Sequence, residues 1–249
     1  MNTQLEELLS KAKYYTPAKK VELAAGETKT VRFQGLNAKR YGVNRLAIGG
    51  TGLDYVMATL AFNNGRDKKI DETSLSALRK LFLARSLRGA LIVEKATELF
   101  VTLTNTDNTA HTVNVQLIGY DDEHLMHKMD SYEANGIEFP QPEFVYITKT
   151  IASGVGQQRF SVNLPSHKLR LYRMAVSTTG TEDEIQLSIR QDRTRIKPEV
   201  FLSQINDEFE DKDIILPATL QAHTPFDLFV TNTGAGAHTV SFIAECYRV

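Results

Sequence analysis

The stretch TNTDNTAHTV, Thr104 to Val113, returns almost unchanged as TNTGAGAHTV, Thr231 to Val240. The similarity continues on both sides, because residues 99–120 align without a gap onto residues 226–247 at a constant offset of 127. In both copies, apolar residues alternate with polar ones on either side of the quoted stretch, which is the period of a half-buried β-strand. Each copy is therefore predicted to form two strands joined by a turn.

The repeat also extends towards the N-terminus. Arg32-Phe33 matches Arg159-Phe160 at the same offset, and RLAIGGTG (45–52) matches RMAVSTTG (173–180) at one residue more. Further alternating positions are aligned as Met57, Thr59 and Ala61 with Ile185, Leu187 and Ile189. Order and spacing agree over a whole domain, so the chain is predicted to be a tandem duplication. The predicted divisions are an N-terminal helix or arm at 1–20, a first domain at 21–120, a linker at 121–147 and a second domain at 148–249.

Three segments have helical periodicity. DETSLSALRKLFLARSLRG (71–89) places apolar residues on one face and has Gly89 as a stop, and KPEVFLSQINDEFE (197–210) has Pro198 suited to a first helical position. Residues 3–15 have a capping box and an apolar stripe. Many short strands with one helix in each copy favour an all-β fold of two tandem jelly-roll β-sandwiches, each with one inserted helix, plus an N-terminal amphipathic helix.

Composition excludes several classes of protein. The 249 residues carry a formal net charge of −1, which speaks against a protein that coats nucleic acid. No stretch approaches the roughly 18 apolar residues of a membrane span. The single cysteine, Cys246, cannot form an internal disulfide and is predicted to be a small apolar residue of the last strand.

The histidines offer little catalytic or metal-binding chemistry. No H-x-H pair of the kind that holds a metal in cupin enzymes occurs, and His124 and His127 are interpreted as part of a solvated linker rather than as ligands. His111 and His238 are repeated between the copies. They could be paired ligands or pH sensors, and the favoured alternative is a hydrogen bond from each to a Thr hydroxyl or a backbone carbonyl of its turn.

No catalytic motif stands out. IGGTG (48–52) lacks the residues that complete a phosphate-binding loop. The acidic runs 121–123, 182–184 and 207–213 lack the spacing of a dedicated calcium loop and are interpreted as solvated edges, with structural calcium left open. The sequence therefore predicts no enzyme, no catalytic residues and no cofactor.

Taken together, the LTNTDNTAHTV and VTNTGAGAHTV hairpins, the two predicted helices and the leading TQLEELLSKAK resemble the double jelly-roll major capsid proteins of icosahedral viruses with an internal membrane, of the corticovirus and tectivirus kind. The resemblance covers essentially the whole chain and is architectural. It implies a structural capsid protein that forms pseudo-hexagonal trimers in a shell over a membrane, located in the virion and assembled in the host cytoplasm. It also implies neighbouring capsomers, penton or minor capsid proteins and possible membrane lipid as partners, and no direct contact with nucleic acid.

The resemblance directs attention to the N-terminal segment as a surface for assembly or for contact with the membrane. Its apolar stripe and its lysines could meet a neighbouring subunit or anionic lipid headgroups, and docking on the chain's own jelly rolls is an equal alternative. The candidate residues are Leu5, Leu8, Leu9, Lys11, Lys13, Lys19 and Lys20.

Two other classes remain as alternatives. A tandem β-sandwich carbohydrate-binding or adhesion protein would need exposed aromatic platforms, and the chain has no tryptophan. A metal-dependent jelly-roll enzyme would need the ligand set that the histidines do not form. The oligomeric state separates these classes, because a capsid protein of this kind is expected to be a trimer.

Overall fold

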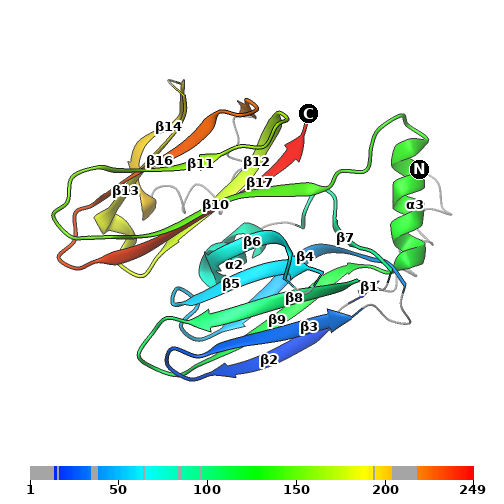
Figure 1. The fold of residues 1–249 in the computed structure, drawn as a ribbon, viewed down its shortest axis with the longest axis horizontal. Coiled ribbons are helices and arrows are strands. Elements are labelled where there is room, and N and C mark those ends of the chain that lie inside the picture. Colours follow the sequence, from blue (N-terminus) through cyan, green and yellow to red (C-terminus); the bar gives the residue numbers. More distant parts are fainter. Residues whose placement is uncertain are drawn as a thin grey trace.

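The structure is a computed structural model that describes residues 14–15, 17–34, 39–63, 65–83, 86–95, 97–192, 194–203 and 218–249. Two β-sandwiches lie one above the other in Figure 1, with a helix between them and a second helix at one end. Neither described helix has the length and apolar character needed to span a bilayer.

The first sandwich consists of two facing antiparallel sheets. One sheet contains β1 (Tyr14–Tyr15), β2 (Ala18–Leu23), β4 (Tyr41–Gly50), β7 (Leu91–Val93) and β9 (His111–Tyr120). The other contains β3 (Thr28–Gln34), β5 (Val56–Phe62), β6 (Asp67–Ser74) and β8 (Glu98–Asn105). Alternate residues of these strands face inward and form one core, in which Phe33, Val101 and Val115 are almost fully buried.

The second sandwich repeats this arrangement. One sheet contains β10 (Pro142–Ile151), β12 (Leu169–Thr178), β15 (Thr219–Leu220) and β17 (His238–Arg248). The other contains β11 (Gln158–Asn163), β13 (Ile185–Gln191), β14 (Thr194–Phe201) and β16 (Pro225–Asn232), and the short 3-10 turn η2 (Glu182–Glu184) precedes β13. Its own core includes Phe226 and Phe242.

Strand order shows that the two sandwiches are copies of one fold. In the first, β9 lies between β2 and β4, and β8 lies between β3 and β5. In the second, β17 lies between β10 and β12, and β16 lies between β11 and β13. Both copies even carry a register irregularity at the same place, between Val43 and Arg45 in β4 and between Leu171 and Arg173 in β12. The predicted double jelly roll is confirmed, and the closing hairpins pair equivalently.

Two details of the sequence alignment are wrong. Val56 pairs with Asn105 and Ile185 pairs with Asn232, so β5 and β13 correspond at an offset of 129. Ile185 is therefore the counterpart of buried Val56 and not of Met57, which faces the other side of its sheet. Arg32 pairs with Phe100 and Ser161 pairs with Asp227, so β3 and β11 are also shifted, by two residues. The turns between the strands differ in length between the two copies, so the offset between equivalent residues changes from strand to strand. Matching apolar patterns across a whole domain does not detect such small changes.

The first inserted helix is shorter than expected. α2 spans Leu75–Leu83, and residues 71–74 belong to β6. The Ser74 hydroxyl accepts a hydrogen bond from the Ala77 backbone N–H (3.1 Å), so the helix begins where a side chain can satisfy a free donor. Gly89 lies beyond the end of α2 and does not terminate it.

The second predicted helix is wrong at its start. Residues 197–201, including Pro198, belong to the edge strand β14, whose pairing with β13 is interrupted between Leu187 and Ile189. An edge strand with an irregular register tolerates a proline because no ladder hydrogen bond needs its missing N–H. Leu202 and Ser203 are helical, and residues 204–210 of the prediction lie outside the described residues.

The segment between the sandwiches contains an unpredicted helix. α3 (Asp122–Glu133) begins at Asp121, whose carboxylate accepts a hydrogen bond from the His124 backbone N–H (3.0 Å). β10 then begins at Pro142, six residues before the boundary expected from the repeat. At the other end, Tyr14 and Tyr15 of the expected N-terminal helix are strand residues that pair with β9, and residues 1–13 lie outside the described residues.

Candidate functional site

The two sandwiches meet along a buried contact that we call the seam. α2 and β6 of the first sandwich pack on the outer face of the β10–β17–β12–β15 sheet, as Figure 1 shows. Ala175 of β12 and Ile243 of β17 belong to the apolar core of the first sandwich, and Phe144 and Tyr146 of β10 pack against it. Burial of this apolar surface joins the two sandwiches into one block.

Three serine hydroxyls lie inside the seam. The Ser74 and Ser177 oxygens are 2.5 Å apart, and the Ser241 oxygen accepts a hydrogen bond from the Ser74 backbone N–H (3.3 Å). Ser241 also contacts the Thr148 hydroxyl (3.0 Å). All three serines are almost fully buried, so their partners across the seam satisfy groups that would otherwise lose hydrogen bonds to water.

The seam also buries a charged pair. Glu245 of β17 is 0% exposed, and its carboxylate accepts hydrogen bonds from the Arg173 guanidinium and the Tyr247 hydroxyl. Burial and the neighbouring Glu245 carboxylate raise the pKa of Tyr247, which keeps this hydroxyl protonated as a donor. The Arg173 guanidinium lies over the ring of Phe82 in α2, and the Arg88 backbone N–H points to Glu245 (3.4 Å). The pair therefore connects both sandwiches.

The repeated TNT…AHT residues form one hydrogen-bonded turn in each sandwich, which we call the first and the second clasp. In the first clasp, the Asn105 side-chain amide donates to the carbonyls of Ala24 (2.9 Å) and Thr109 (2.7 Å). In the second, Asn232 donates to the carbonyls of Ile151 (3.1 Å) and Gly236 (2.7 Å). These side-chain amides bind turn carbonyls that lie outside the strand ladders. The same asparagine has this role in both copies, which explains why the motif is repeated.

The threonines of the motif connect each clasp to a second turn. Thr106 donates from its backbone N–H and its hydroxyl to the Tyr55 carbonyl (2.9 and 2.7 Å). Thr233 donates in the same way to the Glu184 carbonyl (2.8 and 2.9 Å). The Tyr55 hydroxyl in turn donates to the Thr179 carbonyl (3.3 Å), and the Thr179 backbone N–H donates to the Thr239 carbonyl (3.0 Å), so Tyr55 and Thr179 link the two clasps.

The repeated histidines occupy equivalent positions in the clasps. His111 Nε2 lies 2.8 Å from the Asp107 carboxylate and 3.4 Å from the Thr109 hydroxyl, and His111 Nδ1 lies 3.5 Å from the Thr51 hydroxyl. His238 Nε2 lies 3.4 Å from the Glu184 carboxylate. The expected threonine contacts are present in the first clasp. The sequence did not predict the acidic partner of either histidine. Gly234 replaces Asp107 in the second copy, and Glu184 comes from another turn.

Each imidazole ring lies directly over a glycine of the matching TG pair. A Cβ on Gly180 would lie 2.5 Å from His238 Cγ, and a Cβ on Gly52 would overlap the His111 ring. We expect Gly180→Ala to lower the free energy of unfolding by about 1 kcal/mol through this overlap. We expect Gly52→Ala to cost about 2 kcal/mol, because Gly52 also has a positive φ of 61° that disfavours any Cβ.

Removing the imidazole ring distinguishes the cost of overlap with the ring from the cost of a positive φ at the glycine. In thermal unfolding, His238→Ala should make Gly180→Ala nearly neutral, whereas His111→Ala should restore only part of the loss from Gly52→Ala. Equal costs of each glycine substitution with and without its histidine would contradict the overlap.

Asp107 makes the first clasp sensitive to acid. Its carboxylate accepts hydrogen bonds from the Thr109 hydroxyl, from His111 and from the Asn108 backbone N–H, in that order of effect, and these hold its pKa below the usual range. A carboxyl group whose folded pKa is lowered stabilises the fold above its unfolded pKa of about 4, and this contribution is lost as pH falls through the folded pKa. We expect Asp107→Asn to lower the melting temperature at neutral pH and to reduce its decline towards acid. Asp54→Asn in the neighbouring turn is the control, and an equal decline in both variants would contradict the prediction.

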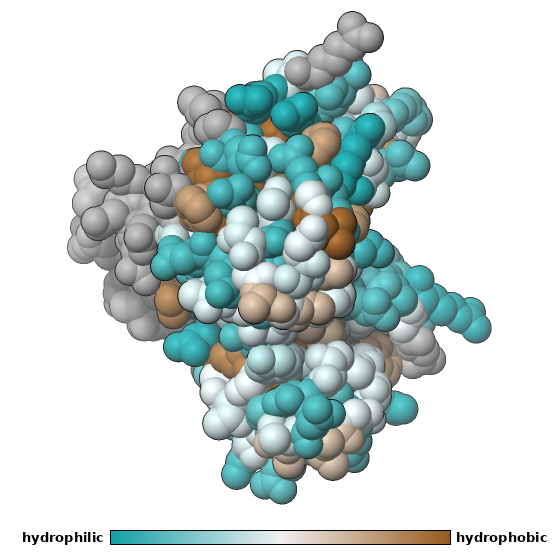
Figure 2. Space-filling view, turned by 90° about the vertical axis from the view of Figure 1, so that its left-hand side faces the viewer, coloured by the Kyte–Doolittle hydropathy of each residue, from teal (hydrophilic) through white to brown (hydrophobic). Residues whose placement is uncertain are grey.

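Both clasps lie at the left-hand end of the molecule in Figure 1, where the β8–β9 and β16–β17 turns are. Figure 2 shows this end as a mixture of hydrophilic and near-neutral residues with isolated hydrophobic spots. Glu182, of a predicted acidic edge, forms an ion pair with Lys80 of α2 (2.5 Å) in this region. The described residues contain no group of three or more His, Cys, Asp or Glu side chains placed to hold a metal ion.

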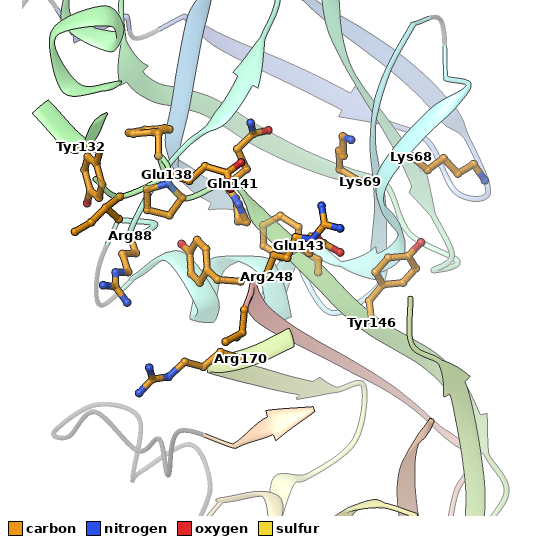
Figure 3. Close-up of a pocket in the computed structure, with 17 residues that line it drawn as sticks. Lys68, Lys69, Arg88, Tyr132, Glu138, Gln141, Glu143, Tyr146, Arg170 and Arg248 are labelled. Atoms are coloured by element: carbon orange, nitrogen blue, oxygen red, sulfur yellow. The ribbon is translucent and has the colours of Figure 1, made fainter. Parts of the chain in front are cut away.

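A groove of about 680 Å³ opens between the sandwiches at their other end. It is lined by β6, by the connection from α3 to β10 and by the end of β17, and Figure 3 shows its side chains. Arg88 comes from the first sandwich and Arg170 from the second, and Figure 3 shows both extending in the same direction. Sequence reasoning missed this groove, since its cationic residues come from distant parts of the chain: Lys68, Lys69, Arg88, Arg170 and Arg248.

The structure describes two of the predicted surface residues. Lys19 and Lys20 are exposed on the edge strand β2, where Lys20 forms an ion pair with Glu22 (3.7 Å). Both line a shallow hollow of about 560 Å³ on the outer face of the sheet, together with Ala47 and Gly49 of β4. The other predicted residues, Leu5, Leu8, Leu9, Lys11 and Lys13, lie outside the described residues.

Two further residues of the sequence analysis have structural roles. His124 Nδ1 lies 2.7 Å from the Asp121 carboxylate that begins α3. Cys246 is fully buried in the second core, and burial raises the pKa of its thiol. This agrees with its prediction as an apolar residue of the last strand.

No family model matches the chain, and no curated protein is similar to it in sequence. Among solved structures, the crystal structure of the MCP of STIV, the Sulfolobus turreted icosahedral virus, has a TM-score of 0.50 at 11% identity, covering 94% of this chain and 96% of that one. The major capsid protein P2 from bacteriophage PM2 has a TM-score of 0.45 at 10% identity, covering 94% and 98%. The similarity to the STIV protein shows a shared fold along nearly the full length of both chains.

Proposed function

We propose that this chain is a structural major capsid protein, which assembles as pseudo-hexagonal trimers into an icosahedral shell over an internal membrane. The observation that carries the proposal is the pair of equivalent jelly rolls joined by a buried seam, in a fold shared with a viral MCP. Three such chains present six similar sandwiches, so a trimer can occupy a hexagonal position in a closed shell. The seam holds the two sandwiches as one block, which a tile of fixed shape requires.

This function places the protein in the virion, with assembly in the host cytoplasm. Its partners would be neighbouring capsomers and the penton or minor capsid proteins, and no catalytic role is needed. The fold similarity is to a structural capsid protein and gives no support to the carbohydrate-binding or adhesion alternative.

Light scattering and electron microscopy of the purified full chain test the proposal. We expect a particle of three times the 27.9 kDa chain mass and ordered shells or sheets at high concentration. A monomer at every concentration, with no ordered assembly, would contradict the capsid function. Binding of that monomer to a glycan array would favour the carbohydrate-binding alternative instead.

The N-terminal segment is proposed as the surface for assembly or membrane contact. A deletion that tests it must end at residue 13, because Tyr14 and Tyr15 pair with β9 and the Pro17 carbonyl accepts a hydrogen bond from Leu117 N–H (3.0 Å). We expect this deletion, and replacement of Leu5, Leu8 and Leu9 by Ser, to leave the melting temperature unchanged and to reduce shell yield or binding to anionic vesicles.

The lysines of the segment are tested separately. Replacing Lys11, Lys13, Lys19 and Lys20 by Ser should reduce vesicle binding if lipid is the partner, and should leave it unchanged if a neighbouring subunit is. Lys149→Ser is the matched control, since Lys149 is exposed on β10, the counterpart of β2 in the second sandwich. Full shell yield and vesicle binding from the deletion would exclude a role for the segment.

A further inference from the structure

One face of α3 presents acidic residues that have no ion-pair partner among the described residues of their own chain. Glu123, Asp130 and Glu133 are exposed, lie three to four residues apart around Met126, and so form one stripe along the helix. None of the three carboxylates forms an ion pair with a described residue. Met126 in the middle of this α3 stripe is 39% exposed, and its sulfur contacts the guanidinium of Arg40, which is ion-paired with Asp122. The stripe therefore combines negative charge with an accessible apolar side chain.

The arginine side of the groove has the opposite character. Arg88, Arg170 and Arg248 are exposed, and their guanidinium groups form no ion pair within the described part of the chain. The nearby Ile137 side chain is 56% exposed and adds an apolar surface. Guanidinium groups bind carboxylates in a planar, two-pronged geometry, so unpaired arginines next to an exposed isoleucine suit an acidic surface with an apolar residue in it.

Both lysines of the groove and one of its two glutamates are already paired within the chain. Lys68 contacts Asp71 (2.7 Å), Lys69 contacts Asp67 (3.1 Å), and Glu143 contacts His167 (2.7 Å). Glu138 also lines the groove and forms no ion pair with a described residue. The three arginines outnumber it, so the unpaired charges of the groove are mainly positive.

The α3 stripe cannot fill the groove of its own chain. Leu125, on the opposite side of the helix, is fully buried against Ala90 and Phe139, so the stripe faces away from the body of the molecule. Tyr132 of α3 nevertheless lines the groove, which makes the two surfaces neighbours on one chain. Two adjacent, complementary surfaces meet their counterparts when a second copy is related by a two-fold rotation.

We propose that this end of the molecule pairs with a second copy across a two-fold axis, with the α3 stripe of each copy on the arginine side of the other's groove. This contact goes beyond the trimer of the proposed function and would join one trimer to the next. It consists of exposed ion pairs, which are individually weak and are screened by salt. It should therefore form at high local concentration, as in a growing shell, and should weaken as salt is added.

Charge reversal tests the proposal in the full chain. The groove variant carries Arg88→Glu and Arg170→Glu, and the helix variant carries Asp130→Lys and Glu133→Lys. In sedimentation at low salt, we expect the wild-type protein to associate in pairs of its basic unit, and each variant to associate about tenfold more weakly or not at all. Mixing the two variants should restore pairing, because each helix then meets a groove of opposite charge in both contacts.

Lys149→Glu is the control, since Lys149 is exposed, does not line the groove and pairs with Val240 at the second clasp. This control should pair like the wild type, and unchanged melting temperatures should show that all variants are folded. Wild-type-like pairing of both reversal variants, or failure of the mixture to regain what each variant lost, would overturn the proposal. Trimer formation is measured separately. Loss of pairing with an intact trimer would contradict this inference and leave the proposed function standing. Pairing of monomers into dimers, with no trimer, would contradict the proposed function and leave this inference standing.

Discussion

Replacing Glu245 with alanine is expected to cost about 3 kcal/mol or more of the free energy of unfolding. The substitution removes the carboxylate that accepts hydrogen bonds from the Arg173 guanidinium and the Tyr247 hydroxyl inside the seam. Breaking a buried charge pair by removing one partner costs far more than the intact pair contributes. For a chain of this size, the expected fall in melting temperature is on the order of 10 °C, which calorimetry measures.

A partly exposed ion pair between the two sandwiches, Lys80 with Glu182, provides the control. Lys80 and Glu182 are 2.5 Å apart, yet their side chains are 32% and 35% exposed, so water compensates for the loss of either. We expect Lys80→Met to cost at most about 1 kcal/mol. Replacing both partners of the buried pair, as Arg173→Met with Glu245→Leu, should recover part of the loss from Glu245→Ala. Similar costs for Glu245→Ala and Lys80→Met would contradict this account of the seam.

Gly89→Ala is expected to cost about 3 kcal/mol, as a severe case of overpacking. A Cβ at this position would overlap the carbonyl oxygen of Pro140, which is backbone and cannot move aside as a side chain can. The Gly89 N–H also donates to the Tyr247 hydroxyl (3.3 Å), so a displacement here would disturb the seam as well. The glycine therefore allows the α3–β10 connection to cross the first sandwich at close range.

Gly156→Ala is the matched control, because a Cβ there would meet nothing within 4 Å. This exposed glycine in the β10–β11 turn should tolerate alanine with no loss and with a gain of up to about 1 kcal/mol from a less flexible unfolded chain. Chemical denaturation compares the two variants. A loss from Gly89→Ala no larger than the change in Gly156→Ala would show that the backbone at Pro140 can yield.

Much of the fold was determined by residues that are close in sequence. Alternation around the two TNT…AHT stretches predicted the closing hairpins, and their repetition predicted two equivalent sandwiches, because strand periodicity and turn chemistry are local properties. The same letters have the same physical role in both copies: the Asn232 and Asn105 amides bind turn carbonyls, and the His238 and His111 rings cover a glycine. Local sequence also predicted α2, although not its start.

Tertiary structure decided what depends on residues that are distant in sequence. The segment from Lys197 to Phe201 has the spacing of a helix, but pairing with β13 makes it a strand, since tertiary context overrides a weak local preference. Glu245 carries no mark of burial in the sequence, and it is buried because β12, α2 and β17 meet at the seam. The arginines of the groove are likewise scattered from 88 to 248, and only the packing of one sandwich on the other brings them to one surface.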